Sequence, residues 1–256
     1  MQRQTITVMI ESFELYYAPA HENRRVNIYL PNDYNESSER YPVLYMFDGH
    51  NLFDDEEAAY GKSWGLREYL EASGRKLIVV GVYCSMHGID RLIEYSPYAY
   101  RTRMTGYVRG TGKDTMDWFS GELKTYIDEH YRTWWHREAT AIGGSSMGGI
   151  MSYYAVMKYN HIYSKAACIS PAFRLSSGMV KAEVDKNELF PDTRVFFSWG
   201  TKEDRQGRLA AIVHELDDNL QAKGISTYMY KHMRGDHSEA SCDQEIPLWM
   251  VYLWDS

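Results

Sequence analysis

Hydrophobic runs and amphipathic stretches alternate along the whole chain. Near the N-terminus, TITVMI (5–10) and RRVNIYL (24–30) alternate apolar and polar residues, which is typical of half-buried strands and predicts a hairpin. Later runs are rich in apolar residues, and where Val, Ile and Phe follow one another they indicate strands buried on both faces, as in a parallel sheet. These runs are VLYMF (43–47), KLIVVGVY (76–83), ATAIGGSS (139–146), SKAACIS (164–170), TRVFFSWG (193–200) and ISTYMYKHM (225–233).

Helical patterns fall between these runs. In 115–131, Trp118, Leu123 and Ile127 lie on one apolar stripe. Segments without such a pattern follow strand ends, where an open α/β sheet binds its ligands. The alternation predicts one doubly wound α/β domain over residues 1–256, with a mostly parallel sheet and an antiparallel N-terminal hairpin. The predicted helices cover 63–73, 115–131, 147–159, 208–224 and 243–254, and the segments predicted to be irregular are 49–62, 85–112 and 171–192.

The composition limits the classes of partner. The chain has 256 residues, of which 44% are hydrophobic and 25% charged, so it can bury a core without a disulfide or a metal ion. Its net charge is −7, and it contains no basic run that could neutralise phosphates. A nucleic-acid partner is therefore not expected.

The cysteines and the apolar stretches predict the compartment. The number of cysteines is odd, and their spacing does not match a metal site, which favours free thiols in a reducing environment. The three are Cys84, Cys168 and Cys242. The N-terminal apolar run is too short for a signal peptide, and no stretch has the length of a membrane span. We therefore expect a cytoplasmic protein without a membrane partner, and association into a homo-oligomer stays open.

A glycine-rich stretch joins a predicted buried strand to a helix. Residues 144–148 read GSSMG and match G-x-S-x-G, the turn that projects a serine hydroxyl from the top of an α/β sheet. Ser146 is the central residue, whereas Ser145 has glycine at only one of the two required offsets, because Met147 stands at the other. The following helix points its positive end at the serine, which favours a developing oxyanion. We expect Ser146 to be a nucleophile.

A serine nucleophile needs a base, and in this fold the chain order is serine, acid, histidine. The histidines after Ser146 are His161, His214, His232 and His237. His237 lies in RGDHS, a loop between the last predicted strand and the last helix, where the base belongs. We predict His237 as the base, and His232 is the weaker alternative.

The acid is expected just past the strand that precedes the base. The sequence TRVFFSWGTKED offers Glu203 and Asp204. Glu203 lies three residues after the glycine that ends the strand, so it is the preferred acid, and the choice between the two stays open. Asp236 would have to fold back on its neighbour His237.

Two backbone N–H groups should form an oxyanion hole. One belongs to Met147, the residue after the nucleophile, and the other to His50, in the loop after VLYMF. Trp64 and Tyr95 are candidates for the walls of an acyl or sugar pocket because aromatic rings offer flat apolar faces.

Several segments of the chain, together with the candidate site residues, resemble those of a known family. The chain resembles the putative-esterase family of the α/β-hydrolase superfamily, which includes feruloyl, acetylxylan and enterochelin esterases and esterase D. The resemblance implies the α/β-hydrolase fold and a serine esterase with a Ser146, Glu203 and His237 triad, without metal or cofactor. One departure is Asp48 before Gly49, where many relatives have His-Gly. The matching segments are NIYLPNDY, RYPVLYMFDGHNLFD, RLIEYSPY, ELKTYIDEHYRT, AIGGSSMGGIMSYYAV, ISPAF, WGTKED and GDHS.

The expected reaction is hydrolysis of a carboxylic ester through an acyl-enzyme. The substrate class is a small or carbohydrate-linked ester, of the acetyl or feruloyl type. One alternative is a thioesterase that acts on S-formylglutathione, and another is a non-catalytic carbohydrate-binding relative. Acyl transfer to an acceptor other than water also stays open, because the same acyl-enzyme serves both outcomes.

Overall fold

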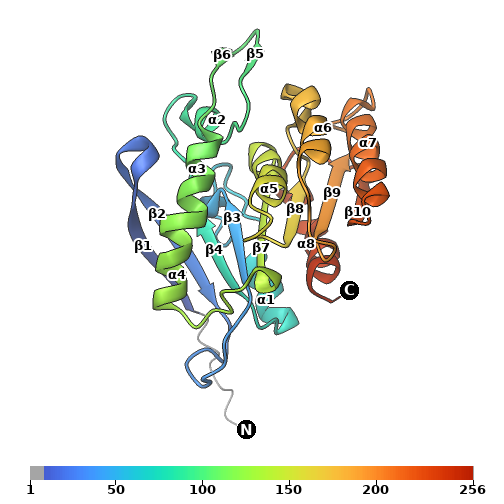
Figure 1. Ribbon diagram of the computed structural model, residues 1–256. Helices are drawn as coiled ribbons and strands as arrows, with labels where there is room; N and C mark the ends of the chain where they lie inside the picture. The colour runs from blue at the N-terminus through green and yellow to red at the C-terminus, as the bar shows by residue number, and fades with distance from the viewer. Residues whose placement is uncertain (1–8, 256) are drawn as a thin grey trace.

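An eight-stranded sheet forms the centre of the computed structural model, which describes residues 9–255 (Figure 1). Its strand order is β1-β2-β4-β3-β7-β8-β9-β10. The first two strands pair antiparallel with their neighbours, and all other pairs are parallel. The strands are β1 (Met9–Tyr17), β2 (Glu22–Leu30), β3 (Val43–Phe47), β4 (Ile78–Val82), β7 (Thr140–Ser145), β8 (Lys165–Ile169), β9 (Arg194–Gly200) and β10 (Ser226–His232). This arrangement confirms the predicted sheet.

The N-terminal hairpin is longer than its sequence pattern suggested. Most of the predicted strand TITVMI lies outside the described residues, and the described strand β1 continues to Tyr17. Its register with β2 runs from the Met9–Leu30 pair to the Tyr17–Glu22 pair. Phe13 and Tyr17 point into the core, so the apolar alternation simply extends past residue 10.

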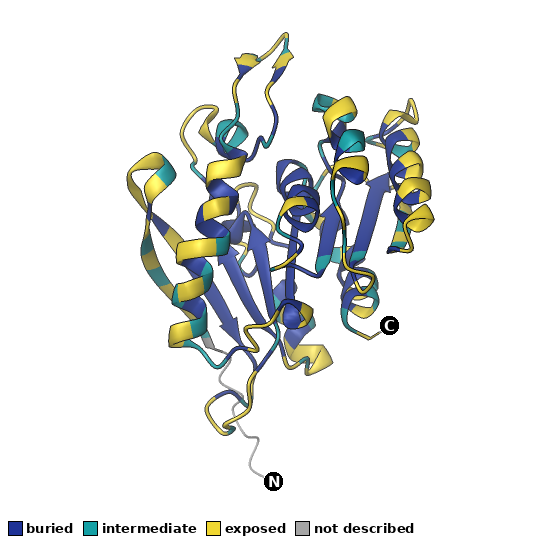
Figure 2. Ribbon diagram, viewed as in Figure 1, coloured by how far each residue is buried: buried dark blue, intermediate teal, exposed yellow. Residues whose placement is uncertain are grey.

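Helices cover both faces of the sheet. Alternate residues of β3 face opposite sides: Tyr45 belongs to the hydrophobic cluster that includes residues of α3 to α7, and Met46 belongs to the cluster that includes residues of α1 and α8. Figure 2 shows the buried strands between helices whose outer faces are exposed. The helices are α1 (Leu66–Ser73), α2 (Asp90–Glu94), α3 (Gly112–Trp118), α4 (Lys124–His130), α5 (Met147–Lys158), α6 (Ser177–Lys186), α7 (Arg208–Ala222) and α8 (Glu239–Trp254), and a π-helical turn, Phe119–Leu123, joins α3 to α4.

Two segments that the sequence predicts to be irregular contain regular structure. Helix α6 lies within 171–192, and 85–112 holds α2 and a small hairpin of β5 (Tyr100–Thr102) and β6 (Gly106–Val108). The hairpin projects from the body of the molecule (Figure 1). Helix α6 was missed because it buries only Val180, Glu183 and Val184, which is too few positions for a clear 3.6-residue period.

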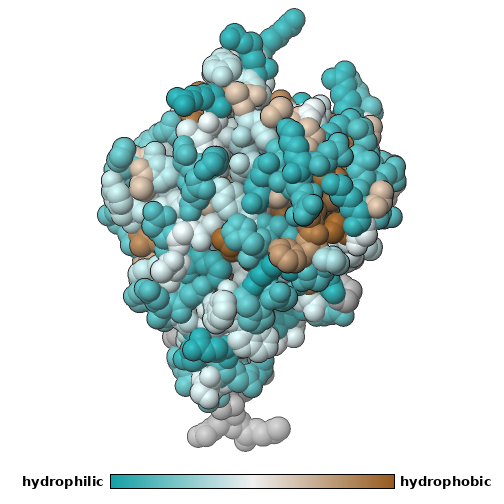
Figure 3. All heavy atoms as spheres, viewed as in Figure 1, coloured by the Kyte–Doolittle hydropathy of each residue, from teal (hydrophilic) through white to brown (hydrophobic). Residues whose placement is uncertain are grey.

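One face of the molecule carries few hydrophobic groups (Figure 3). The face seen in Figure 3 is mostly hydrophilic, and hydrophobic residues appear on it in small, separate groups. No helix in the described part of the chain combines the length and the apolar character that a membrane crossing requires.

Candidate active site

Ser146 lies at the sharp turn between β7 and α5. Its backbone has φ 57° and ψ −115°, a conformation that L-residues rarely adopt. Its N–H donates to the carbonyl of Ile169 at 3.0 Å, and its own carbonyl accepts from the N–H of Ala172 at 2.9 Å. Because one bond goes to the last residue of the neighbouring β8 and the other to the loop just after it, they hold this strained turn at the carboxyl edge of the sheet.

The glycines of G-x-S-x-G are required by close packing. A Cβ atom on Gly144 would lie 2.9 Å from the carbonyl carbon of Gly148. A Cβ atom on Gly148 would lie 2.9 Å from Cβ of Phe47, at the end of β3. Strand β7, helix α5 and the neighbouring strand β3 therefore meet next to Ser146, and a side chain at Gly144 or Gly148 would push them apart.

His237 and Glu203 are in direct contact. His237 lies between β10 and α8, and its Nδ1 is 2.6 Å from Oε2 of Glu203. The Glu203 side chain is 5% exposed and that of His237 is 49% exposed. Burial alone would raise the pKa of Glu203, but hydrogen bonds from His237, the Gly200 N–H and the Ser170 hydroxyl outweigh it and lower the pKa. The acid is thus held charged beside the imidazole.

The turns that carry Glu203 and His237 pack backbone against backbone. The Lys202 N–H donates to the Gly235 carbonyl at 2.9 Å. A Cβ atom on Gly200 would lie only 2.3 Å from that same carbonyl oxygen. The glycine that ends β9 therefore sets the distance between the acid and the base.

Replacing Gly200 with alanine is expected to separate these two turns. Overpacking of this kind typically costs about 1–3 kcal/mol in the free energy of unfolding, which urea denaturation measures. Ester turnover should fall as well, because the Gly200 N–H also binds Glu203. Gly178→Ala is the matched control, since no atom lies within 4 Å of its added Cβ. Equal stability of the two variants would contradict this account.

The alternative acid and base have other partners. The Asp204 carboxylate accepts from the N–H groups of Leu209 at 3.0 Å and Ala210 at 2.8 Å, at the start of α7. His232 is buried, and its Nδ1 lies 2.9 Å from Oε1 of Glu245. Asp204 therefore caps a helix, and His232 pairs inside the protein.

One cavity brings the predicted nucleophile and base together. It has a volume of about 490 Å³, and Ser146, His237 and His50 all line it. A larger hollow, of about 810 Å³, lies near the start of β8, and none of the predicted site residues lines it. The smaller cavity is thus the one with the groups for acyl chemistry.

The N–H groups predicted for the oxyanion hole belong to first turns of helices. Met147 is the first residue of α5, and His50 lies in the short 3₁₀ helix Gly49–Asn51. First-turn N–H groups have no acceptor within their own helix, so they are available to a ligand. A Cβ atom on Gly49 would lie 2.4 Å from the backbone of Gly81, which shows how closely this loop packs on β4.

Asp48, just before that loop, forms a buried ion pair. It has a left-handed backbone with φ 57°, and its two carboxylate oxygens accept from Nε and Nη2 of Arg91, each at 2.7 Å. Burial would raise the pKa of Asp48, but the charge and hydrogen bonds of Arg91 keep it lowered. The Asp48 N–H also donates to the Tyr95 hydroxyl at 3.4 Å. Side chain and backbone together anchor the start of the His50 loop.

Asp48→Asn is expected to loosen this loop and lower kcat. Loss of an oxyanion donor typically costs about a hundred- to a thousand-fold, and a displaced donor should cost less, about ten- to a hundred-fold. Steady-state kinetics on 4-nitrophenyl acetate measure the change, and urea denaturation shows whether the variant is folded. Asp33→Asn is the control with the same charge change, because Asp33 pairs with Lys76 on the surface. An unchanged kcat in Asp48→Asn would show that the pair does not hold the loop.

Trp64 and Tyr95 do not line the cavity, so the prediction that they form its walls is wrong. Trp64 is 2% exposed and packs in the core beneath α1 and α8. Tyr95 is 1% exposed, and its ring packs edge-on against Phe47 with 5.0 Å between centroids. Both rings are used in core packing. The apolar residues that line the cavity are instead Ala59, Tyr60, Met86 and Cys242, of which Tyr60 is 84% exposed.

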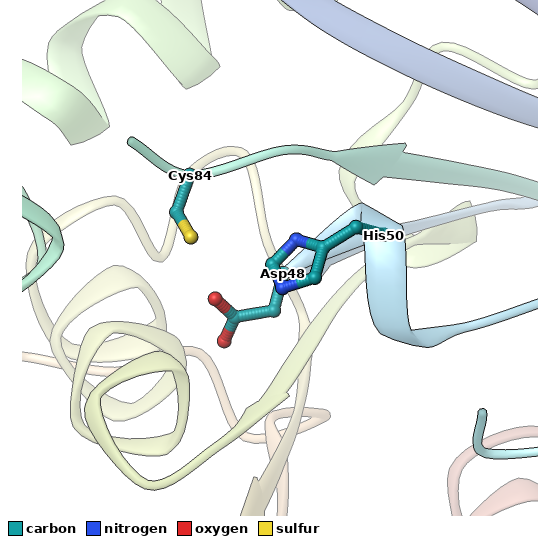
Figure 4. Close-up of side chains that lie close together, drawn as sticks. All are labelled: Asp48, His50 and Cys84. Carbon is teal, nitrogen blue, oxygen red and sulfur yellow. The ribbon is translucent and has the colours of Figure 1, made fainter. Parts of the chain in front are cut away.

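Asp48, His50 and Cys84 form the group of described residues that could hold a metal ion (Figure 4). Their ligand atoms lie within 4.8 Å of one another. Both Asp48 oxygens already bind Arg91, however, and burial raises the pKa of the Cys84 thiol, so it stays protonated. A metal would have to displace the guanidinium and deprotonate this thiol, so we assign no ion to the group.

Sequence reasoning missed Ser170. This residue follows β8 with φ 41°, and its hydroxyl donates to Oε1 of Glu203. The available signal was its position: it directly follows β8, the strand next to β7, and Ser146 directly follows β7. A polar residue at that edge of the sheet is placed to contact the site.

The chain matches the family described as Putative esterase over residues 19–247, and it belongs to that family. It is also 26% identical to the uncharacterized protein YbbA of Bacillus subtilis over 213 residues, which are 80% of each chain. Membership in this family supports hydrolase activity.

Solved structures show the same fold. An IroE-like serine hydrolase from Shewanella oneidensis superposes with a TM-score of 0.77 at 18% identity, over 95% of this chain and 80% of the other. An S-formylglutathione hydrolase (FrmB) from Staphylococcus aureus has a TM-score of 0.71 at 17% identity and covers 99% of both chains. The protein thus has the α/β-hydrolase fold.

Proposed function

We propose that this protein is a serine carboxylic-ester hydrolase that acts through an acyl-enzyme on small or carbohydrate-linked acyl esters. The observation that carries the proposal is the 2.6 Å contact between His237 and Glu203 at a cavity that Ser146 also lines. The strained turn at Ser146 and the family membership support it. No step in the proposed reaction needs a metal or a cofactor.

In the first half-reaction, the Ser146 hydroxyl attacks the ester carbonyl. His237 takes the proton on Nε2, while its Nδ1–H donates to Glu203, which fixes the tautomer and stabilises the imidazolium. The negative charge that develops on the carbonyl oxygen is stabilised by the N–H groups of Met147 and His50. His237 then gives its proton to the leaving alcohol.

In the second half-reaction, water attacks the acyl group on Ser146. His237 is the base again, and Glu203 keeps the same contact with its Nδ1. The enzyme returns to its starting state when the serine oxygen regains the proton. An acceptor alcohol in place of water would give acyl transfer instead of hydrolysis.

The acyl-enzyme is the species to detect. Purified protein mixed with 4-nitrophenyl acetate should release nitrophenolate, and mass spectrometry of the quenched protein should find one acetyl group on the peptide that contains Ser146. A fluorophosphonate probe should label the same residue. Absence of both labels in the folded protein would favour the alternative of a non-catalytic carbohydrate-binding relative.

A thioesterase that acts on S-formylglutathione is the second candidate, favoured by the similarity to the hydrolase from S. aureus. The same nucleophile and base would serve it, because a thioester forms the same acyl-enzyme. Parallel measurement of kcat/KM on S-formylglutathione and on acetylated and feruloylated sugars separates the two candidates.

A further inference from the structure

The cavity beside Ser146 has an excess of negative charge. The described residues that line it include four carboxylates and a single Lys or Arg side chain: Asp48, Asp236, Glu239, Glu245 and Arg91. Asp48 and Arg91 form the bidentate pair described above, so these two charges cancel. Glu245 is buried, and its Oε1 lies 2.9 Å from Nδ1 of His232, so this carboxyl group is already engaged inside the protein. Asp236 and Glu239 remain, and they flank His237 in the sequence.

Glu239 has few partners of its own. It is the first residue of α8 and is partly buried at the cavity. Its Oε1 accepts from the Asn51 amide at 3.3 Å, and no other side-chain donor to Glu239 is found within the described residues. Burial raises its pKa, and it lies within electrostatic range of His237, Asp48 and Arg91. A carboxylate in this position is stabilised by any donor or cation that enters the cavity.

Asp236 adds a second charge at the rim. Its side chain is half exposed, and it accepts from the hydroxyls of Ser238 at 2.5 Å and Ser241 at 3.0 Å. These hydrogen bonds lower its pKa, so it stays ionised. Its nearest cation is Lys202, at 3.9 Å on the exposed surface. Such a distant, solvated partner cancels little of the field inside the cavity.

We propose that Glu239 is a specificity residue that makes this site select esters bearing a positively charged group near the scissile bond and disfavour esters bearing a carboxylate. The inference rests on the proposed function. A ligand cation would contact a partly buried carboxylate, whereas a ligand anion would meet two carboxylates of like charge. Like-charge contact in a cleft is a strong means of rejecting a substrate.

Three acetate esters test the selection. Acetylcholine is the cationic probe, 3,3-dimethylbutyl acetate is its uncharged isostere, and the acetate of 4-hydroxybutanoate is the anionic probe. A pH-stat follows acid release from each. A charge at contact distance in a site of intermediate dielectric changes kcat/KM by about ten-fold, so we expect the cation to exceed the isostere, and the isostere the anion, by about this factor. Added salt should reduce both ratios.

Variants assign the effect to one side chain. Glu239→Gln should reduce the ratio of cation to isostere at least about three-fold, and Glu239→Lys should invert it. Glu129→Gln removes the same charge from the exposed face of α4 and should leave the ratio unchanged. Because Glu239 also lies in the first turn of α8, where a negative side chain stabilises the helix, unfolding of each variant is measured alongside.

The outcomes separate this inference from the proposed function. If the wild-type protein hydrolyses none of the three esters, nor 4-nitrophenyl acetate, the proposed function fails. If it hydrolyses the uncharged ester but treats all three alike, or prefers the anion, the inference is overturned and the function stands. An unchanged ratio in Glu239→Gln also overturns it.

Discussion

Ser146→Ala is expected to lower kcat for 4-nitrophenyl acetate by about four to six orders of magnitude. Removal of the nucleophile leaves only the contributions of substrate binding and of the oxyanion donors, which explains the size of the loss. The strained turn should survive, because its hydrogen bonds to Ile169 and Ala172 use backbone atoms. Initial rates measured by nitrophenolate absorbance, together with circular dichroism, test both statements.

Ser145→Ala is the control for this variant. Ser145 ends β7 in the same motif, and the change removes the same hydroxyl one residue away. It should alter turnover by less than about ten-fold, because it removes no group from the proposed reaction. A large loss in Ser145→Ala with retained activity in Ser146→Ala would mean that Ser145, and not Ser146, is the nucleophile.

Much of the fold could be predicted because strands that are buried on both faces consist mainly of apolar residues. The runs VLYMF and VFFSW are almost entirely apolar because both faces of β3 and β9 are covered, and strands buried on both faces require such runs. The position of Ser146 could be predicted for a similar reason. Close packing forbids a side chain at Gly144 and Gly148, so the sequence has glycine two residues before and two residues after Ser146.

The remaining features depend on contacts between distant segments. Arg91 lies 43 residues after Asp48, and nothing in either local sequence indicates that they pair. Ser170 reaches Glu203 only because β8 and β9 are neighbours in the sheet. The chain contains 22 tyrosines, and composition alone cannot say which of them face a cavity. Tyr95, a candidate for the pocket wall, is instead buried in the core.

Glu203→Gln is expected to lower kcat by about four orders of magnitude, the typical cost of an amide in place of the triad acid. The amide oxygen can replace Oε1, which accepts from Gly200 and Ser170. Its NH₂ group must then point at Nδ1 of His237 and make that nitrogen an acceptor. The proton moves to Nε2, so His237 can no longer take the proton of Ser146. The pH dependence of kcat and the rate of fluorophosphonate labelling should both report this loss of the base.

Asp204→Asn is the matched control, since it makes the same change from acid to amide at the next residue. Its amide oxygen can still accept an N–H at the start of α7, so turnover should stay within a few-fold of the wild-type value. The two variants together decide which of the adjacent carboxylates is the acid. Loss of activity in Asp204→Asn with retention in Glu203→Gln would mean that the 2.6 Å contact between Glu203 and His237 is not the one used in catalysis.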